Sequence, residues 1–257
     1  MSPQHIRHTH RLERSGDLIT KTFRSWSRGE PVREWTSLQQ LAQTAPGLAA
    51  EPVAAGLTDD PPWVRMTLLP GAPLRGSWPD RRVDRLADAM RELWSVPVAD
   101  LSPIDMHATD YWADLFARTS PPEPGPLLLA YELVGKWLHS DMVAALLGSA
   151  DLNVLGQGDP QVGNMLYDQR ADRFRLVDFE DAGPSEPAFE LANFAEHLGT
   201  RDTGLDRLVD RFSVDQDRFD GYRRLQAGFW FLHLLPRRAE RADDVAELAD
   251  RIGRLLG

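Results

Sequence analysis

The sequence predicts an α+β fold of two lobes, a small antiparallel β lobe with one helix and a larger, mainly helical lobe. Two observations predict it. Segments rich in β-forming residues, together with one amphipathic helix, occupy the first 70 residues, whereas helical periodicity dominates from residue 80 onward. We accordingly divide the 257-residue chain into a small lobe of residues 1–70 and a large lobe of residues 71–257.

The small lobe is expected to begin with a β-hairpin over residues 8–23. Its two segments, HTHRLER and DLITKTF, alternate loosely in polarity around Ser-Gly-Asp at 15–17, a composition typical of a tight turn. Residues 32–43 place apolar side chains at three-residue spacing, which predicts an amphipathic helix. A β-rich segment over residues 61–71 ends at Pro-Gly and completes the predicted lobe.

Helical periodicity, with apolar residues three or four positions apart, recurs through the large lobe. The helices predicted on this basis cover residues 80–96, 110–118, 127–147, 189–198, 221–235 and 244–256. In the compact region at residues 152–183, short apolar runs alternate with turn residues. This pattern predicts a loop, a strand, a turn and a second strand.

Composition and charge exclude several classes of protein. Cys is absent, which excludes disulfides, thiolate metal sites and a cysteine nucleophile. The formal net charge of −10 disfavours a nucleic-acid partner and favours a cationic ligand, although an acidic surface also keeps any protein soluble. No apolar run is long enough to span a bilayer, and the N-terminal residues lack the apolar core of a signal peptide. We therefore expect a soluble, cytoplasmic protein without a membrane partner.

One block of the large lobe combines two acids and an amide at short spacing. Asp159 lies in GDPQVGN, Asn164 ends that motif, and Asp178 begins Asp-Phe-Glu after the predicted hairpin. Phosphoryl transfer requires a carboxylate at the attacking hydroxyl and metal ions that neutralise the phosphates. Asp159 suits the first task, and Asn164 and Asp178 supply the hard oxygen ligands that Mg²⁺ prefers. The two strands that follow Asn164 can bring Asp178 next to Asp159 and Asn164.

Each of these residues taken alone has a simpler explanation. Asp and Asn are common in loops, where their side chains bond the backbone. A strand Lys is usually solvated, and a Glu in the first turn of a helix stabilises the helix by its charge. The ordered combination of GDPQVGN with LVDFE across one hairpin favours the functional interpretation.

The motifs GQGDPQVGNMLY and LVDFEDAGPSEPAFELANF resemble successive motifs of the aminoglycoside phosphotransferase and choline kinase family of small-molecule kinases. Matching features follow in the same order over roughly residues 8–200. The resemblance implies a bilobal protein-kinase-like fold that transfers the γ-phosphate of ATP or GTP to a hydroxyl group. It also implies that Asp159 is the catalytic base and that Asn164 and Asp178 are the ligands of Mg²⁺.

The resemblance extends to the small lobe. Lys21 in DLITKTF is similar to the lysine that binds nucleotide phosphates, and Glu34 in REWTSLQQL is similar to the helix glutamate that pairs with it. WVRMTLLPGAPL resembles the strand and hinge that receive the adenine, so Thr67, Leu68 and Leu69 would offer backbone groups to the base. The small lobe would thus bind the nucleotide, and the large lobe would carry the catalytic loop and the acceptor site.

The sequence departs from the family pattern at two places. The family's His before Gly-Asp is Gln157, which can replace some hydrogen bonds of an imidazole but cannot carry a positive charge. The N-terminus is short, so that a shortened first hairpin without a glycine-rich phosphate loop is expected. These departures favour an alternative, a pseudokinase that binds a nucleotide or another ligand without catalysis. A metal-dependent hydrolase is a third interpretation, but one Asn and two Asp are few ligands for a two-metal site.

The acceptor is expected to be a small hydroxylated compound that is cationic or amine-bearing, such as an aminoglycoside or another antibiotic. Acids of the large lobe that could complement it are Asp105, Asp110, Asp114, Glu186, Glu196 and Asp202. Glu180 and Asp181 could face solvent, cap the loop or touch the substrate. Glu190, where the family often has Asp, is expected to be a hydrogen-bonding group behind the catalytic loop.

The histidines give little indication of a metal site. The spacing of His5, His8 and His10 at the N-terminus fits no common ligand pattern, so metal binding is not expected there. Three further histidines lie within apolar helical patterns, where a hydrogen-bonded interior or interfacial position is the usual outcome: His139, His197 and His233.

Overall fold

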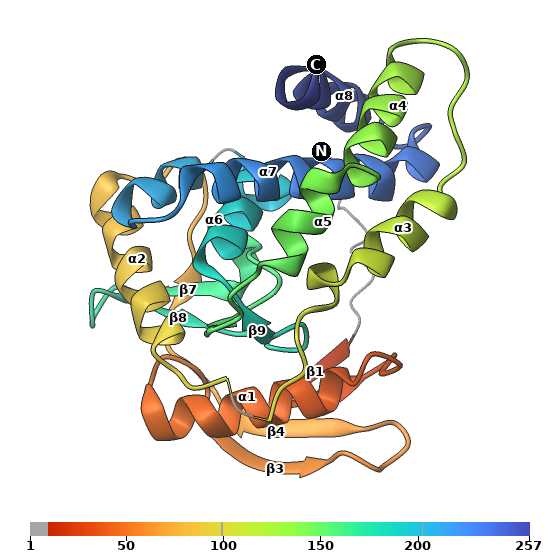
Figure 1. Cartoon of the computed structure of the whole chain (residues 1–257). Helices are drawn as coiled ribbons and strands as arrows, with labels where there is room; N and C mark the ends of the chain where they lie inside the picture. The colour runs from red at the N-terminus through yellow and green to blue at the C-terminus, as the bar shows by residue number, and fades with distance from the viewer. Residues whose placement is uncertain (1–9, 99, 202) are drawn as a thin grey trace.

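A computed structural model describes residues 10–98, 100–201 and 203–257 and shows two lobes (Figure 1). The lobe at the bottom of Figure 1 is a β-sheet with one helix. The larger lobe above it is mainly helical, with short strands on the side that faces the sheet. The predicted α+β architecture is therefore confirmed, while the boundary at residue 70 stays a prediction.

The small lobe consists of one antiparallel sheet and the helix that packs on it. Its elements are β1 (His10–Ser15), β2 (Leu18–Phe23), α1 (Glu30–Thr44), β3 (Pro52–Gly56) and β4 (Trp63–Thr67). The strands pair in the order β1-β2-β4-β3, and α1 lies between this sheet and the large lobe (Figure 1). Gly16, with a φ of 61°, forms the predicted turn between β1 and β2, since glycine tolerates this left-handed conformation. Buried Leu38 and Leu41 confirm the amphipathic character of α1.

The sequence does not predict strand β3. Its segment, PVAAG, is rich in Pro, Ala and Gly, residues that are depleted in strands. The strand forms because it pairs with β4, with a register shift between Pro52 and Ala54. Tertiary pairing therefore overrides the weak local preference.

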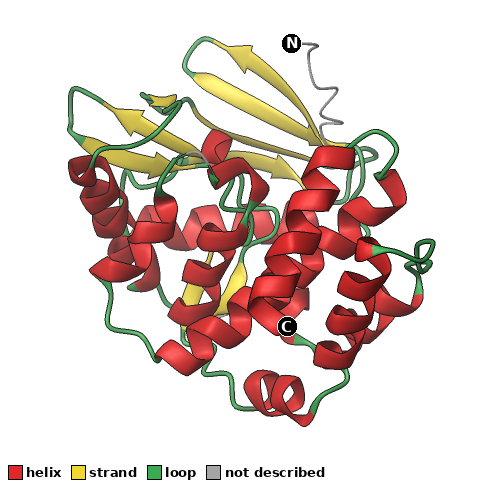
Figure 2. Ribbon diagram, turned by 90° about the horizontal axis from the view of Figure 1, so that it is seen from above, coloured by secondary structure: helices red, strands yellow, loops and turns green. Residues whose placement is uncertain are grey.

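Helices make up most of the large lobe, as Figure 2 shows in red. The α-helices are α2 (Asp80–Trp94), α3 (Thr109–Ala117), α4 (Pro126–Leu138), α5 (Asp141–Gly148), α6 (Pro187–Glu196), α7 (Gln216–Leu234) and α8 (Ala242–Leu256). Short 3₁₀ helices are η1 (Asp105–His107), η2 (Val162–Asn164), η3 (Leu198–Thr200), η4 (Leu205–Arg211) and η5 (Leu235–Arg237). Among the described residues, no helix is both long and apolar enough to cross a membrane.

Two small sheets connect the helical lobe to the small lobe. Their strands are β5 (Ala72–Pro73), β6 (Val154–Gly156), β7 (Met165–Asp168), β8 (Arg173–Leu176) and β9 (Gly183–Ser185). Antiparallel pairing gives one sheet in the order β5-β7-β8 and a second from β6 and β9. The hairpin β7-β8 is the pair of strands predicted after GDPQVGN, and it fixes the distance between that loop and the Asp-Phe-Glu segment.

The single helix predicted over residues 127–147 is wrong, because the chain breaks it into α4 and α5. The Ser140 hydroxyl donates to the Trp137 carbonyl oxygen at 2.7 Å, and His139 Nδ1 lies 2.7 Å from the Gly135 carbonyl oxygen. Side chains that bond the preceding turn in this way compete with continuation of the helix. The apolar periodicity continues across the break because both helices contact α7.

A buried aromatic stack joins Trp78, which lies just before α2, to the sheet β5-β7-β8. The rings of Trp78 and Phe174 lie 5.1 Å apart and nearly parallel, and the Tyr167 ring meets Phe174 edge-on. Phe174 on β8 is fully buried. The stack holds the β7-β8 hairpin against α2, so that it supports the position of the residues at both ends of the hairpin.

We predict that Phe174→Ala lowers the free energy of unfolding by about 3–5 kcal/mol, because it removes a buried ring and leaves a cavity. Urea denaturation measures the change. The control is Met142→Ala on α5, where the side chain is 62% exposed and the expected change is within about 0.5 kcal/mol. Equal stability of the two variants would contradict the assigned core.

Candidate active site

The loop after β6 carries the first group of predicted site residues. Gly158 has a φ of 84°, and a Cβ at this position would overlap the carbonyl oxygen of Asp181. Glycine is therefore required both by the backbone conformation and by the close approach of the two segments. This contact places Asp159 beside the segment that follows β8.

Asp159 is held by three side chains. Its Oδ2 accepts hydrogen bonds from Gln161 Nε2 at 2.8 Å and from Asn164 Nδ2 at 3.2 Å, and its Oδ1 lies 3.3 Å from His197 Nε2. Burial raises the pKa of Asp159, but the bonds from His197 and Gln161 outweigh burial and hold this pKa below its usual range. Asp159 is thus an oriented carboxylate at neutral pH.

His197 is a residue of the site that the sequence predicts only as an interior histidine. It follows α6, and its Nδ1 accepts the backbone N–H of Gly199 at 3.0 Å, so that Nε2 carries the proton that faces Asp159. The indole of Trp230 on α7 packs edge-on against the imidazole at 4.7 Å. His139 and His233 are exposed rather than interior, and His139 Nδ1 lies 2.7 Å from the Gly135 carbonyl oxygen.

Asn164 and Asp178 approach each other through the backbone. The Val177 N–H donates to the Asn164 carbonyl oxygen at 3.0 Å, which joins η2 to the end of β8. The Asn164 amide nitrogen also donates to the Asp159 carbonyl oxygen at 3.1 Å. Its amide nitrogen is directed to Asp159, so its amide oxygen is the group left for a cation. The structure therefore brings the three predicted residues of the large lobe to one place.

Lys21 of β2 is buried and reaches across the lobe boundary. Its Nζ hydrogen-bonds Glu34 Oε2 at 3.0 Å and Asp178 Oδ1, and it lies 3.0 Å from Glu180 Oε2. Burial lowers the pKa of Lys21, but the three carboxylates outweigh burial and raise this pKa well above its usual range. The predicted Lys21–Glu34 pair is present, and the ammonium group is permanently charged.

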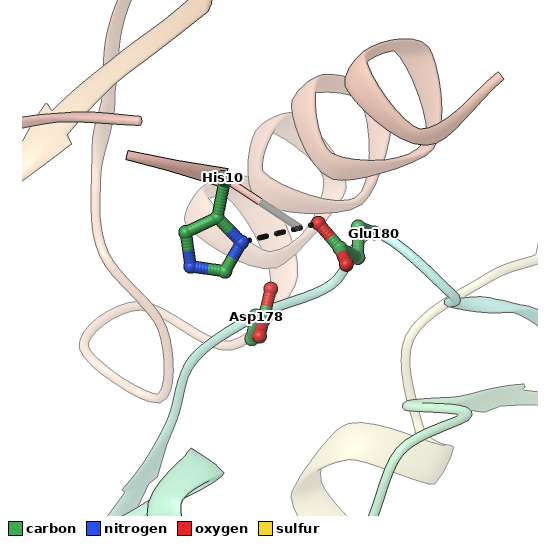
Figure 3. Close-up of side chains that lie close together, drawn as sticks. All are labelled: His10, Asp178 and Glu180. Carbon is green, nitrogen blue, oxygen red and sulfur yellow. Dashed lines mark ion pairs between the residues drawn. The ribbon is translucent and has the colours of Figure 1, made fainter. Parts of the chain in front are cut away.

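His10 and Glu180 complete this cluster, as Figure 3 shows. His10 Nδ1 on β1 lies 3.5 Å from Glu180 Oε2, and one ligand atom each of His10, Asp178 and Glu180 fall within 4.8 Å of one another. His5 and His8 lie outside the described residues. The Asp178 and Glu180 carboxylates and the Asn164 amide oxygen are the donors that Mg²⁺ prefers, so this part of the site fits the expected ion.

Gln157 supports the conformation of Asp178. Its Nε2 donates to the carbonyl oxygens of Val177 and Asp178, both at 3.1 Å. Asp178 has a φ of 67°, a left-handed conformation that costs a non-glycine residue about 1–3 kcal/mol. The Gln157 amide therefore organises the segment that carries Asp178, a role that requires no positive charge.

Glu190 lies behind the catalytic loop, as predicted. Its Oε2 accepts the backbone N–H of Gln157 at 3.2 Å, and its Oε1 accepts the hydroxyl of Ser185 at 2.8 Å. Burial raises the pKa of Glu190 to about 7, and the accepted hydrogen bonds oppose this shift. Asn193, one turn later on α6, donates to the Gly158 carbonyl oxygen at 3.2 Å, so that α6 holds the loop at two points.

The hinge after β4 offers fewer free backbone N–H groups than predicted. The Thr67 N–H donates to the Glu51 carbonyl oxygen at 3.0 Å, and the Leu68 N–H donates to the Asp17 carbonyl oxygen at 2.8 Å. These two N–H groups are engaged within the small lobe. Of the three predicted hinge residues, Leu69 is the one whose N–H has no such bond within the described part of the chain.

Two of the acids predicted to complement a cationic acceptor are structural instead. Glu186 is buried and pairs with Arg218 at 2.6 Å, and Glu196 is buried and pairs with Arg223 and Arg251 at 2.8 and 2.6 Å. Buried carboxylates require such partners, so neither is available to a substrate.

Of the other predicted acids, Asp105 lies 3.6 Å from Arg33, and Asp110 and Asp114 are exposed on α3. Asp202 lies outside the described residues.

Both the sequence and the fold are similar to those of known proteins. The sequence matches the model of the phosphotransferase enzyme family over residues 9–228. The fold is similar to that of APH(2")-IIia in complex with GDP and kanamycin, at 18% identity over 96% of this chain and 90% of that chain, with a TM-score of 0.68. It is also similar to choline kinase LicA from Streptococcus pneumoniae, at 15% identity over 98% and 90% of the two chains, with a TM-score of 0.65.

A third similar structure is a thermostable mutant of aminoglycoside phosphotransferase APH(4)-Ia in ternary complex with ADP and hygromycin B. The identity is 12% over 97% of this chain and 93% of that chain, and the TM-score is 0.58. No curated protein sequence matches the chain. These similarities confirm the predicted bilobal, protein-kinase-like fold and the predicted resemblance to aminoglycoside phosphotransferases and choline kinase.

The raised pKa of Glu190 predicts that the stability of the protein depends on pH. Its pKa rises from 4.5 to about 7 on folding, so its contribution to the free energy of unfolding is fully present below pH 4.5 and is lost as the pH rises through 7. We predict that the wild type loses about 3 kcal/mol more than Glu190→Gln between pH 4.5 and 8, because the glutamine cannot ionise. Thermal unfolding across this range tests the difference. The exposed Glu132→Gln on α4 serves as the control, and parallel pH profiles for the wild type and Glu190→Gln would contradict the assignment.

Proposed function

The chain belongs to the phosphotransferase enzyme family, and from this premise we propose that it transfers the γ-phosphate of ATP or GTP to a hydroxyl group of a small molecule. The observation that carries the proposal is the position of Asp159. Its oriented carboxylate lies in contact with Asn164 and on the loop that packs against the segment after Asp178. A base, hard oxygen ligands and a buried lysine are the parts that phosphoryl transfer requires.

Asp159 is proposed to orient the acceptor and to receive its proton. The hydroxyl oxygen forms a bond to the γ-phosphorus, the bond from that phosphorus to the β–γ bridging oxygen breaks, and the hydroxyl proton passes to the Asp159 carboxylate. Because the pKa of this carboxylate is low, the proton is transferred late in the reaction, while the bond between the hydroxyl oxygen and the γ-phosphorus forms. His197 and Gln161 keep the carboxylate in the orientation that this transfer needs.

Lys21 is proposed to bind the phosphates of the nucleotide, with Glu34 fixing the direction of its side chain. Asn164 and Asp178 would hold Mg²⁺, which when bound neutralises charge on the phosphates. The hinge, through the N–H of Leu69 and the carbonyl groups of Thr67 and Leu68, would receive the base. ATP and GTP are both retained as donors, because these backbone groups can pair with either base.

An amine-bearing acceptor is supported by the formal net charge of −10 and by two similar structures, which are complexes with kanamycin and with hygromycin B. Among the described acids of the predicted set, Asp105, Asp110 and Asp114 are exposed and remain accessible to it. The specific compound is to be found by screening aminoglycosides, cyclic peptide antibiotics, macrolides, choline and amino-alcohols with each donor.

The alternative of a pseudokinase depends on Gln157, which replaces the family histidine. Both hydrogen bonds from Gln157 Nε2 to the Val177–Asp178 segment are formed, and Asp178 keeps its contact with Lys21. These contacts support the enzyme. Nucleotide binding without phosphate transfer to any member of the acceptor panel would instead support the pseudokinase.

Asp159→Asn is predicted to lower phosphate transfer by about 10²–10⁴-fold while nucleotide affinity stays within about twofold, because the base is lost but the phosphate contacts are kept. Mass spectrometry that detects the gain of one phosphate by the acceptor measures the rate. Asp243→Asn, an exposed change on α8, is the matched control. Transfer at the wild-type rate by Asp159→Asn would show that Asp159 is not the base.

Asp178→Asn is predicted to weaken nucleotide binding by about tenfold or more in Mg²⁺ and to change it little in EDTA, because the variant loses a charged metal ligand. Calorimetric titration under both conditions gives the two affinities. An equal loss with and without Mg²⁺ would mean that Asp178 acts through Lys21 rather than through the ion.

A further inference from the structure

Arg28 is a cation at the active site that the proposed function leaves without a role. It lies in the segment between β2 and α1, and its side chain is half-exposed. Its Nη1 lies 2.6 Å from Asp181 Oδ1, and its Nε lies 3.3 Å from Glu30 Oε1. The Arg28 backbone N–H also donates to Glu30 Oε2 at 2.9 Å, which anchors this segment to the start of α1. The guanidinium group therefore crosses from the small lobe to the large lobe.

The partner of Arg28 in the large lobe adjoins the catalytic loop. The carbonyl oxygen of Asp181 is so close to Gly158 that no residue with a Cβ fits at position 158. Gly158 directly precedes Asp159, so the Arg28–Asp181 pair lies beside the loop on which Asp159 would hold the acceptor hydroxyl.

The charges of the named site residues are unbalanced. Glu34, Asp159, Asp178, Glu180 and Asp181 contribute carboxylates, whereas the cations are Lys21 and Arg28. The ammonium group of Lys21 is already engaged by three of these carboxylates. A triphosphate would add further negative charge to this region, which requires cations beyond Lys21.

In the described part of the small lobe, the β1-β2 turn is too short to cover the terminal phosphate. The turn between β1 and β2 spans the two residues Gly16 and Asp17, so no glycine-rich loop of backbone N–H donors lies between these strands. Arg28 belongs to the same lobe and reaches the site from the segment between β2 and α1. A guanidinium group presents several N–H donors in a planar array that matches phosphate oxygens, and it is exposed enough to change partners.

We propose that Arg28 is a further phosphate-binding residue, which exchanges Asp181 for the γ-phosphate of the bound nucleotide and covers that phosphate from the small lobe. The inference rests on the proposed function. Arg28 meets the large lobe at Asp181, beside the loop that carries Asp159, and the transferred phosphate must lie near Asp159, so the contact of Arg28 is to the γ-phosphate. A nucleoside diphosphate lacks the group that Arg28 binds.

The test compares a non-hydrolysable triphosphate with the corresponding diphosphate, each titrated calorimetrically with Mg²⁺. Arg28→Ala is expected to weaken triphosphate binding by about tenfold or more and to leave diphosphate binding within about twofold. Arg28→Lys should lie between the wild type and Arg28→Ala, because it keeps the charge but not the planar array of donors. The control is Arg24→Ala, an exposed arginine of the same segment, with both affinities unchanged.

Asp181→Asn gives a second, independent variant, since it frees Arg28 and removes a negative charge. It is expected to tighten triphosphate binding more than diphosphate binding. If Arg28→Ala changes both affinities equally or neither, Arg28 only joins the lobes and the inference is overturned while the proposed function stands. If the wild type binds neither nucleotide, the proposed function fails and the inference fails with it.

Discussion

The buried ammonium group of Lys21 is the interaction on which the rest of the structure depends. It joins strand β2 to helix α1 through Glu34 and to the large lobe through Asp178 and Glu180. Removing one partner from a buried ion pair typically costs about 3–5 kcal/mol, because a charge is left without compensation. The same cluster thus fixes the position of the lysine that we propose to bind the nucleotide and the orientation of the two lobes, so that stability and the proposed function share one constraint.

Other contacts across the lobe boundary reinforce this arrangement. Arg33 on α1 donates to the carbonyl oxygens of Ser102 and Ala182 at 2.7 and 3.1 Å, and the Leu176 N–H donates to the Leu48 carbonyl oxygen at 2.8 Å. Backbone acceptors in the large lobe are satisfied by a side chain of the small lobe, and a backbone acceptor in the small lobe is satisfied by a backbone N–H of the large lobe. These bonds hold the segments of the proposed active site against one another, which favours a fixed geometry there.

The sequence predicts the parts of the site that the chemistry itself demands. The acids and the amide of GDPQVGN and Asp-Phe-Glu are residue types that phosphoryl transfer needs, and the short hairpin between the two motifs constrains their separation. Lys21 and Glu34 are predicted by the family resemblance, since each of them alone has a simpler explanation. His197 could not be predicted in its role, because its contact with Asp159 depends on how α6 packs against the catalytic loop. Glu196 could not be distinguished from a surface acid, since its arginine partners come from α7 and α8. Strand β3 depends in the same way on a partner strand rather than on its own composition.

The most direct test of the account is a crystal structure of the chain with Mg²⁺ and a non-hydrolysable nucleoside triphosphate. The account predicts that the phosphates lie between Lys21 and Asp159, with the ion held by Asn164 and Asp178 and the base at the hinge beside Leu69. A nucleotide bound elsewhere, or bound here with its γ-phosphate directed away from Asp159, would contradict it.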